Sequence, residues 1–351
     1  MEPITRRVFL KRTISGVGGL ILAKSLGANI SLGRSHADMS RVVVAKHPEA
    51  TDGVKVINPV NVQTMMDESI KRLTAQPSVV DAWASLLPDF KKGHLIAIKV
   101  NTTWGFPTHA EVVNAIITEL TSAGVPENNI IIYDIGTDAL HQVGWKTNTG
   151  DVGVRCFGTF KQISMSGFFV NGQESVPEEG WGLDWDNPVD ILGREMALST
   201  IVTRCDHLIN VPVLKTHSFD SAGVTLSLKN HFGSISDPPA LHDNLPVACA
   251  TLNSQKAIKD KTRLVVIDSL FGCWSRLGDP PNFAPNSLIV TRDPVAADYI
   301  GAEMINEERA KFKQPPKNIS PLLDKAAELG VGTNNLEKME LLKFVLISKR
   351  K

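Results

Sequence analysis

The feature that most constrains the fold is a set of short, almost wholly apolar runs at residues 94–100, 129–133, 208–214 and 263–267. Apolar residues at nearly every position, rather than at every second one, indicate strands that are covered on both faces. Such strands are typical of a parallel sheet with helices on either side. The sequence therefore predicts an α/β fold with a mostly parallel sheet flanked by helices.

Other segments supply the helices and outer strands that this fold requires. Apolar residues recur at helical intervals in several of them, and one helix begins at Pro294 with Asp293 as its expected N-cap. We expect helices at residues 62–73, 79–87, 111–120, 197–205, 294–307 and 321–329, strands at 41–45 and 287–290, and a last apolar run at 341–347.

The pattern changes between residues 141 and 187, where Gly, Ser and acidic residues surround Trp145, Phe157, Phe160, Phe168, Phe169, Trp181 and Trp185. Loss of periodicity over so long a segment is typical of an insertion or lid. The sequence thus predicts an irregular, aromatic-rich insertion over 141–187. Its aromatic residues either cover a planar ligand or form a small satellite core. We favour the core, because large aromatic side chains in loops must be buried somewhere.

The N-terminus carries a twin-arginine export motif. Arg6 and Arg7 lie within the sequence TRRVFLK, and a Gly-rich, weakly apolar run follows at 14–26. That run is too short for a helix that spans a bilayer, which needs about 20 predominantly apolar residues. We therefore expect residues 1–37 to be a twin-arginine signal peptide, with an uncleaved membrane anchor as the alternative.

This signal predicts both location and partner. The remaining residues, 38–351, would form a single α/β domain in the periplasm or another extracytoplasmic space, without a stable membrane span after cleavage. Cleavage would follow Ala37 or an earlier residue near Ala28. The twin-arginine translocase is the expected partner during export, and it carries folded proteins that often contain a cofactor.

Charge and cysteine content bear on the remaining partners. Removing residues 1–37 takes away six basic residues and one acidic residue, which changes the balance from 37 against 37 to 31 against 36. A mildly acidic protein has no general field for nucleic acid, so we expect no nucleic-acid partner. The cysteines have no C-x-x-C spacing, so the sequence has no iron–sulfur or structural zinc motif. Any cofactor is unknown, and buried thiols are favoured over a disulfide.

Polar residues follow the apolar runs where each predicted strand ends. Lys99 and Asn101 follow the first run, and Lys215 and His217 follow the third. Ligands bind at the carboxyl ends of strands in open parallel sheets, so these side chains mark a candidate site. Lys99 interrupts an apolar run, and a buried lysine requires a partner or a ligand.

The segment 206–236 holds the densest group of such residues. We expect a strand at 208–214, a turn at 215–217 and then a helix whose end carries Lys229, Asn230 and His231. Val224, Leu228 and Phe232 would form the core-facing stripe of that helix, which leaves Lys229 on another face.

Several motifs resemble the family known as domain of unknown function 362. The resemblance covers roughly residues 94–301. It rests on five motifs and one further histidine. These are HLIAIKVN with Lys99 and Asn101, INVPVLKTH with Lys215 and His217, VTLSLKNHFGSI with Lys229, Asn230 and Gly233, LVVIDSLFG with Asp268, RDPVAADYIG with Asp293 and Asp298, and His242. Residues 272–281 are a looser version of the family's Gly-rich run. Some relatives carry a ferredoxin-like module, whose Cys pattern is missing here, so no electron-transfer role is implied.

These residues predict an anion site with acid–base residues beside it. Lysines bind phosphate or carboxylate as point charges, and asparagine adds orienting hydrogen bonds. The predicted ligand-binding residues are Lys99, Asn101, Lys215, Lys229, Asn230 and His242. The predicted catalytic residues are His217 or His231 for proton transfer, with Asp268 orienting the histidine or supplying a carboxylate.

A rival interpretation makes the same region a metal site. His217, His231, His242 and Asp268 are ligand types that zinc accepts. No H-E-x-x-H or H-x-H spacing supports that interpretation, and nearby lysines raise the cost of holding a cation. We therefore assign no metal ligand.

The leading functional hypothesis is an exported enzyme that acts on an anionic small molecule, or through an anionic cofactor, by acid–base or redox chemistry. The sequence contains no nucleophile elbow, Walker loop or G-x-G-x-x-G after a strand that would narrow the reaction. The alternative is a non-catalytic periplasmic protein that binds a ligand or a partner, using the segment 141–187.

Overall fold

The computed structural model describes residues 39–166, 169–175, 180–217 and 223–347, with only the backbone described at 164–166 and 169–175. The predicted signal peptide lies outside these residues. Their main feature is a ten-stranded sheet with the path β14-β1-β13-β12-β9-β2-β3-β4, in which β10 joins beside β12 and β11 pairs with β10. The strands are β14 Met339–Val345, β1 Ser40–Lys46, β13 Ser287–Thr291, β12 Thr262–Cys273, β9 His207–Asn210, β2 Ile96–Lys99, β3 Ile130–Tyr133, β4 Arg155–Cys156, β10 Val213–Thr216 and β11 Val224–Thr225.

Strand directions confirm the predicted fold class. β12, β9, β2, β3 and β4 are all parallel neighbours, and β10 runs parallel to β12. β13 lies antiparallel between β12 and β1, whereas β1 is parallel to β14. The sheet is therefore mixed but mostly parallel.

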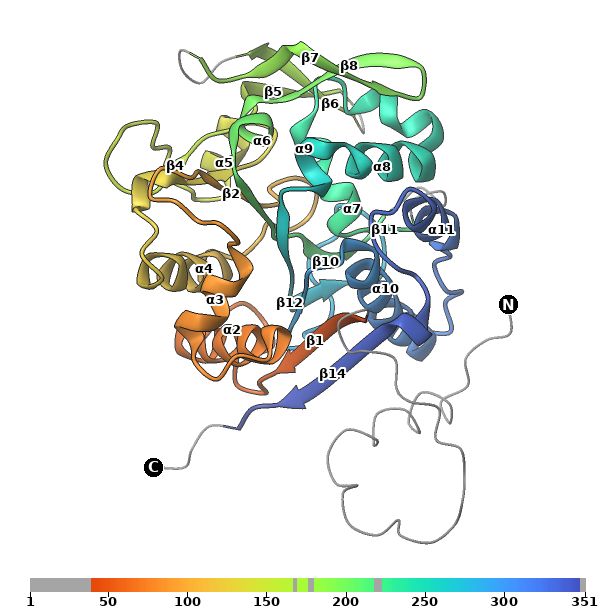
Figure 1. Ribbon diagram of the computed structural model, residues 1–351. Coiled ribbons are helices and arrows are strands. Elements are labelled where there is room, and N and C mark those ends of the chain that lie inside the picture. The colour runs from red at the N-terminus through yellow and green to blue at the C-terminus, as the bar shows by residue number, and fades with distance from the viewer. Residues whose placement is uncertain (1–38, 167–168, 176–179, 218–222, 348–351) are drawn as a thin grey trace, which may run out of the picture.

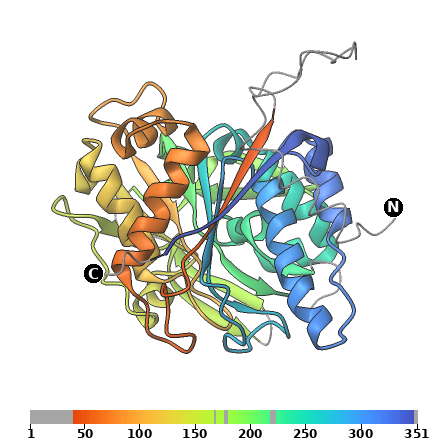
Figure 2. The same ribbon diagram turned by 90° about the horizontal axis from the view of Figure 1, so that it is seen from below.

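Helices cover both faces of the sheet, as the all-apolar strands predict. α2 (Pro59–Thr74), α3 (Val79–Leu86) and α4 (Ala110–Ser122) cover one face. On the other face lie α8 (Leu245–Ser254), α10 (Pro294–Lys311) and α11 (Ser320–Glu328), and both layers are visible in Figures 1 and 2. Alternate strand residues enter the two cores: Leu264 and Val266 join the first, whereas Val265 and Ile267 join the second. Each strand must therefore be apolar throughout.

The remaining helical elements are short. They are α5 Thr137–Gln142, α6 Thr200–Arg204, α7 Ser227–Asn230, α9 Lys256–Lys259, η2 Glu127–Asn129, η3 His231–Ser234, η4 Pro239–Asn244 and η5 Leu336–Lys338. The helix expected at 197–205 is thus only α6, which follows a strand. No helix in the described part of the chain is both long and apolar enough to cross a membrane.

The segment 206–236 differs most from its prediction. The expected strand is two strands, because the chain leaves β9 at Val211 and Pro212 and enters β10, which pairs with β12. The expected long helix is wrong. Val224 and Thr225 form β11, antiparallel to β10, and only one helical turn follows. Gly223 precedes β11 with φ of 65°, a left-handed conformation that does not belong to a helix.

Two β-hairpins occupy much of the predicted insertion. β5 (Phe160–Ser166) pairs with β6 (Phe169–Ser175), and β7 (Leu183–Ile191) pairs with β8 (Arg194–Ser199). The satellite core is not seen among the described side chains. Phe157 is buried in the main core with Trp181 against it, Trp145 packs on the opposite core, and Trp185 is 56% exposed.

Candidate functional site

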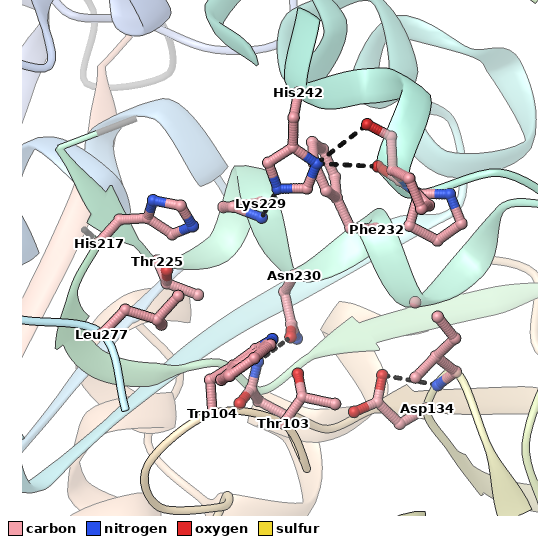
Figure 3. Close-up of a pocket in the computed structure, with 15 residues that line it drawn as sticks. Thr103, Trp104, Asp134, His217, Thr225, Lys229, Asn230, Phe232, His242 and Leu277 are labelled. Atoms are coloured by element: carbon pink, nitrogen blue, oxygen red, sulfur yellow. Dashed lines mark hydrogen bonds between the residues drawn. The ribbon is translucent and has the colours of Figure 1, made fainter. Parts of the chain in front are cut away.

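A cavity of about 70 Å³ lies at the carboxyl ends of β2, β3 and β10, beside α7. On the same measure a water molecule needs roughly 10–15 Å³, so the cavity has room for a small ligand. Figure 3 shows the histidines, Lys229 and Thr225 on one side and residues of the loops after β2 and β3 on the other. The lining residues are Asn101, Thr103, Trp104, Asp134, Ile135, His217, Thr225, Lys229, Asn230, Phe232, Gly233, Pro238, Pro239, His242 and Leu277.

Lys229 is the lysine that lines the cavity. Its Nζ lies 3.5 Å from His242 Nε2 and 3.9 Å from the centroid of the Phe232 ring. Among the described residues it makes no ion pair with a carboxylate. Burial lowers the pKa of Lys229 to about 8. The side chain therefore presents a cation to the cavity at neutral pH, and it loses its proton more readily than an ordinary lysine.

His242 is held by two backbone carbonyls. Its Nδ1 lies 3.1 Å from the oxygen of Pro238 and 3.3 Å from that of Pro239, and a carbonyl only accepts hydrogen bonds. The Nδ1 must therefore carry a hydrogen, which leaves the lone pair on Nε2 directed toward Lys229. Burial and the charge of Lys229 lower the pKa of His242 to about 4, although the two carbonyls oppose this. His242 is a neutral proton acceptor.

His217 and Thr225 complete the same wall. The imidazole rings of His217 and His242 lie 6.3 Å apart with an interplanar angle of 30°. Burial, and next the charge of Lys229, lower the pKa of His217 to about 2, so this ring is also neutral. Thr225 is 8% exposed, and its Oγ1 is buried without a hydrogen-bond partner among the residues that the structure describes. A buried hydroxyl without a partner is costly, and Thr225 is one of the residues that line the cavity.

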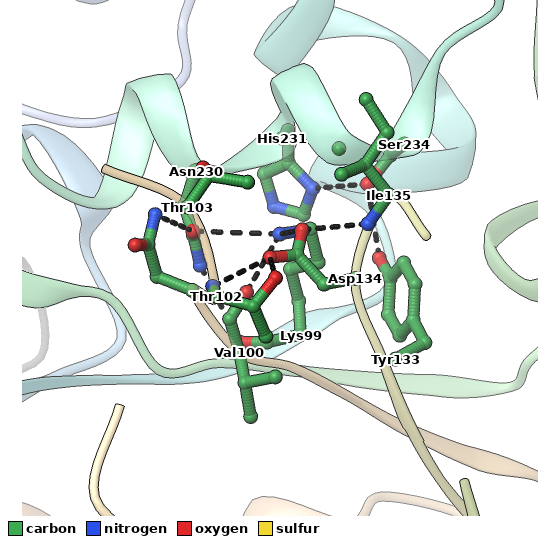
Figure 4. Close-up of polar contacts among 12 residues, drawn as sticks. Lys99, Val100, Thr102, Thr103, Tyr133, Asp134, Ile135, Asn230, His231 and Ser234 are labelled. Atoms are coloured by element: carbon green, nitrogen blue, oxygen red, sulfur yellow. Dashed lines mark hydrogen bonds and ion pairs between the residues drawn. The ribbon is translucent and has the colours of Figure 1, made fainter. Parts of the chain in front are cut away.

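Lys99 is enclosed beneath the cavity and has the partner that the sequence requires. Its Nζ donates to Asp134 Oδ1 at 2.6 Å, to the Val100 oxygen at 2.7 Å and to Asn230 Oδ1 at 3.4 Å (Figure 4). Burial lowers the pKa of Lys99, and attraction to Asp134 opposes that change. All three N–H groups have protein acceptors. Lys99 therefore supports the site and does not reach a ligand.

Lys215 is buried and clamps the loop after β2. Its Nζ donates to Asn101 Oδ1 at 2.7 Å and to the backbone oxygens of Thr103 and Trp104, both at 2.6 Å. Burial lowers the pKa of Lys215 to about 7. Trp104 has φ of 58°, a left-handed conformation that is unusual for a bulky residue. The lysine thus holds a strained loop that forms part of the cavity wall.

Asparagine side chains and a glycine join these lysines. Asn101 Nδ2 donates to Asn230 Oδ1 at 3.3 Å, and Asn230 Nδ2 donates to Asn210 Oδ1 at 2.7 Å. A Cβ at Gly233 would lie 2.2 Å from Asp134 Oδ1 and 2.9 Å from Lys99 Nζ. The ion pair of Lys99 and Asp134 therefore fits beneath the cavity only because residue 233 has no side chain.

The structure does not bring the three predicted catalytic residues together. His217 lines the cavity, but His231 is not among its lining residues: it borders a separate cavity of about 40 Å³, and its Nδ1 lies 3.3 Å from Ser234 Oγ. Burial and the charge of Lys99 lower the pKa of His231 to about 3. Asp268 lies within β12, which continues to Cys273. Of the predicted ligand-binding residues, Asn101, Lys229, Asn230 and His242 line the cavity, whereas Lys99 and Lys215 lie behind it.

Asp268 pairs with a histidine that the sequence did not reveal. His109 donates to Asp268 Oδ2 from its backbone nitrogen at 2.8 Å, and its Nδ1 lies 2.7 Å from the same oxygen. Burial lowers the pKa of His109, but the charge of Asp268 and the hydrogen bond outweigh it, so the pKa is raised. Nothing in the local sequence marks His109. The pair fixes the far end of the loop that Lys215 clamps.

Two other carboxylates are buried and hydrogen-bonded. Asp134 binds Lys99 through Oδ1, while its Oδ2 accepts from the nitrogen and the hydroxyl of Thr102 at 2.7 Å. Asp298 is buried and accepts hydrogen bonds from the backbone nitrogens of Ser227 and Leu228 at the start of α7. Burial raises the pKa of Asp298 to about 7. The expected N-cap, Asp293, is confirmed.

The rival metal set does not converge. Within the described residues no three His, Cys, Asp or Glu side chains lie close enough together to hold a metal ion. Cys156, Cys205, Cys249 and Cys273 are buried free thiols, as the sequence favoured. The side chains that line the cavity include an amine, two imidazoles and a hydroxyl.

Comparison with known proteins agrees with the motifs. A search of curated proteins finds no match. A family model described as a domain of unknown function, DUF362, matches residues 96–303, which include every residue that lines the cavity. Because this match covers more than half of the 351 residues, the chain belongs to the DUF362 family.

Proposed function

We propose that the cavity binds a small anionic molecule and that the protein is an enzyme that moves a proton on it. The observation that carries this proposal is the Lys229 amine, which faces the cavity without a carboxylate partner among the described residues and lies in the same wall as the unpartnered hydroxyl of Thr225. A cation and a hydroxyl donor together match a carboxylate or phosphate group.

The charge of the cavity favours an anion despite the presence of Asp134. The carboxylate of Asp134 is matched by Lys99 at 2.6 Å, so the two charges offset each other. His217 and His242 are neutral. Lys229 therefore leaves an excess of positive charge, in a space that suits a small carboxylate or phosphate better than a large cofactor.

Ligand binding would also turn the histidines into better bases. The charge of Lys229 is one cause of the low pKa of both His217 and His242. A bound anion offsets that charge, so the pKa of each imidazole rises toward its ordinary range. His242 Nε2 then accepts a proton from the ligand more readily, which provides acid–base chemistry only when the ligand is present.

The test is titration calorimetry of the folded protein with acetate and with inorganic phosphate. We expect at least one of them to bind to the wild type, and Lys229→Met to reduce its affinity at least tenfold. Lys311→Met is the matched control, because Lys311 is an exposed lysine that pairs with Glu308 far from the cavity. Equal affinity in the wild type and in Lys229→Met would refute the site assignment.

We also propose that the twin-arginine translocase exports the folded protein to the periplasm. The support is the sequence TRRVFLK and the weakly apolar run that follows it. Replacing Arg6 and Arg7 together by Lys keeps the charge but removes the motif. The precursor should then accumulate in the cytoplasm, and unchanged recovery from the periplasm would contradict the proposal.

A further inference from the structure

The lysines near the cavity differ in how many hydrogen-bond acceptors surround their amines. The Nζ atoms of Lys99 and Lys215 each donate to three or more acceptors of the protein. In the part of the chain that the structure describes, the polar contact of Lys229 Nζ is His242 Nε2, at the long distance of 3.5 Å. Lys229 is thus the amine that is placed to react with a molecule in the cavity.

The surroundings of Lys229 suit an amine that acts as a nucleophile. The Phe232 ring covers one side of Nζ, and burial lowers the pKa of Lys229 to about 8. At pH 7 roughly a tenth of such amines are neutral, compared with well under a thousandth for an ordinary lysine. A neutral amine has the lone pair that attacks a carbonyl carbon, and desolvation of a lysine is a known means of activating it.

We infer that Lys229 forms an imine with the carbonyl group of a short α-keto acid bound in the cavity, between His242 and the hydroxyl of Thr225. This inference rests on the proposed anion site and names the class of anion. The hydroxyl of Thr225 donates to the substrate carboxylate. The protonated imine keeps the positive charge of the lysine, so the carboxylate stays paired after the covalent bond forms.

The step balances with the groups at hand. Lys229 first gives a proton to His242 Nε2, and its lone pair then attacks the carbonyl carbon to form the C–N bond. The C–O bond then breaks, and the carbonyl oxygen leaves as water. Both hydrogens of that water come from the neutral amine. His242 returns its proton to the imine nitrogen. No oxidant or reductant takes part.

The experiment uses pyruvate as the probe and sodium cyanoborohydride, which reduces a protonated imine to a stable secondary amine. Intact mass and peptide mapping of the native full chain should show one adduct, at Lys229. It should form a few hundredfold faster than adducts at exposed lysines such as Lys311, roughly the ratio of the neutral amine fractions at pH 7. Labelling spread over exposed lysines, with Lys229 unmodified, would overturn the inference.

Binding and labelling of the wild type, measured separately, distinguish this inference from the proposed function. Lys229→Arg forms no imine under these conditions, so its adduct should disappear. If the wild type binds these anions through Lys229 but yields no adduct, only the imine is refuted. If neither anion binds and neither protects Lys229 from labelling, the anion site is refuted. Mapping on the wild type decides the matter even if the arginine variant does not fold.

Discussion

The lysines beneath the cavity and the lysine in its wall show how the same side chain serves two purposes. Lys99 and Lys215 are buried, and their ammonium groups are surrounded by oxygens of Asp134, Asn101 and backbone carbonyls. Lys229 contacts a ring face and one imidazole nitrogen. All three have a lowered pKa. The supply of acceptors therefore distinguishes a supporting lysine from one that is available to a ligand.

Lys99→Met should give the largest effect and so tests the supporting half of this comparison. The substitution leaves Asp134 buried without its cation, which typically destabilises a protein by roughly 3–5 kcal/mol. Urea unfolding would measure this loss. Adding Asp134→Asn should recover part of it, because the uncompensated charge is then removed. A loss below about 1 kcal/mol would mean that the pair does not support the site.

Lys215→Met should lower the free energy of unfolding somewhat less than Lys99→Met does. It removes charge-assisted hydrogen bonds to Asn101, Thr103 and Trp104, and a loss of roughly 2–3 kcal/mol is expected in urea unfolding. The strained loop should relax as well, so amide hydrogen exchange should accelerate in residues 102–106 more than in α2, which is distant. Unchanged exchange in the loop would show that other contacts hold it.

The affinity for acetate or phosphate should depend on pH through Lys229. The charged amine is the form that binds, so affinity falls as the pH rises through its pKa of about 8, by up to about tenfold for each further unit, or about 1.4 kcal/mol. Below that pH the lysine stays charged and contributes no further change. Lys229→Arg should abolish this decline, because arginine remains charged. Calorimetry from pH 7 to about 10 would reveal either profile.

Lys229→Met should have the smallest effect on folding. The substitution removes a desolvated cation and leaves a side chain of similar length against Phe232. The free energy of unfolding should therefore change by less than about 0.5 kcal/mol. The same variant should lose anion binding. Destabilisation comparable with that of Lys99→Met would place Lys229 among the supporting lysines and break the comparison.

The sheet was predictable because each central strand packs against a core on both faces and so needs apolar residues at successive positions. Val265 and Val266 enter opposite cores, so both must be apolar, and this leaves a clear signal in the sequence. The segment after β10 was not predictable in the same way. Val224, Leu228 and Phe232 satisfy a helical spacing, yet Val224 is in a strand and Leu228 in a single helical turn.

The site was predictable only in part, since neighbours in sequence diverge in space. Asn230 lines the cavity, whereas the next residue, His231, borders a separate cavity, because α7 ends at Asn230 and the chain continues as η3. The requirement that Lys99 has a partner followed from burial alone. That the partner is Asp134 follows from the pairing of β2 with β3, which local patterns do not specify.

The two carbonyls that hold His242 also determine where a proton can go. A histidine that relays protons must release one from the nitrogen opposite to the one that receives it. At His242 that opposite hydrogen is directed at the oxygens of Pro238 and Pro239, which do not carry a proton onward. A proton taken up at Nε2 must leave by the same atom. If the proposed ligand binds, His242 would return its proton to that molecule and would not pass it to solvent, which suits reactions with no net uptake or release of protons.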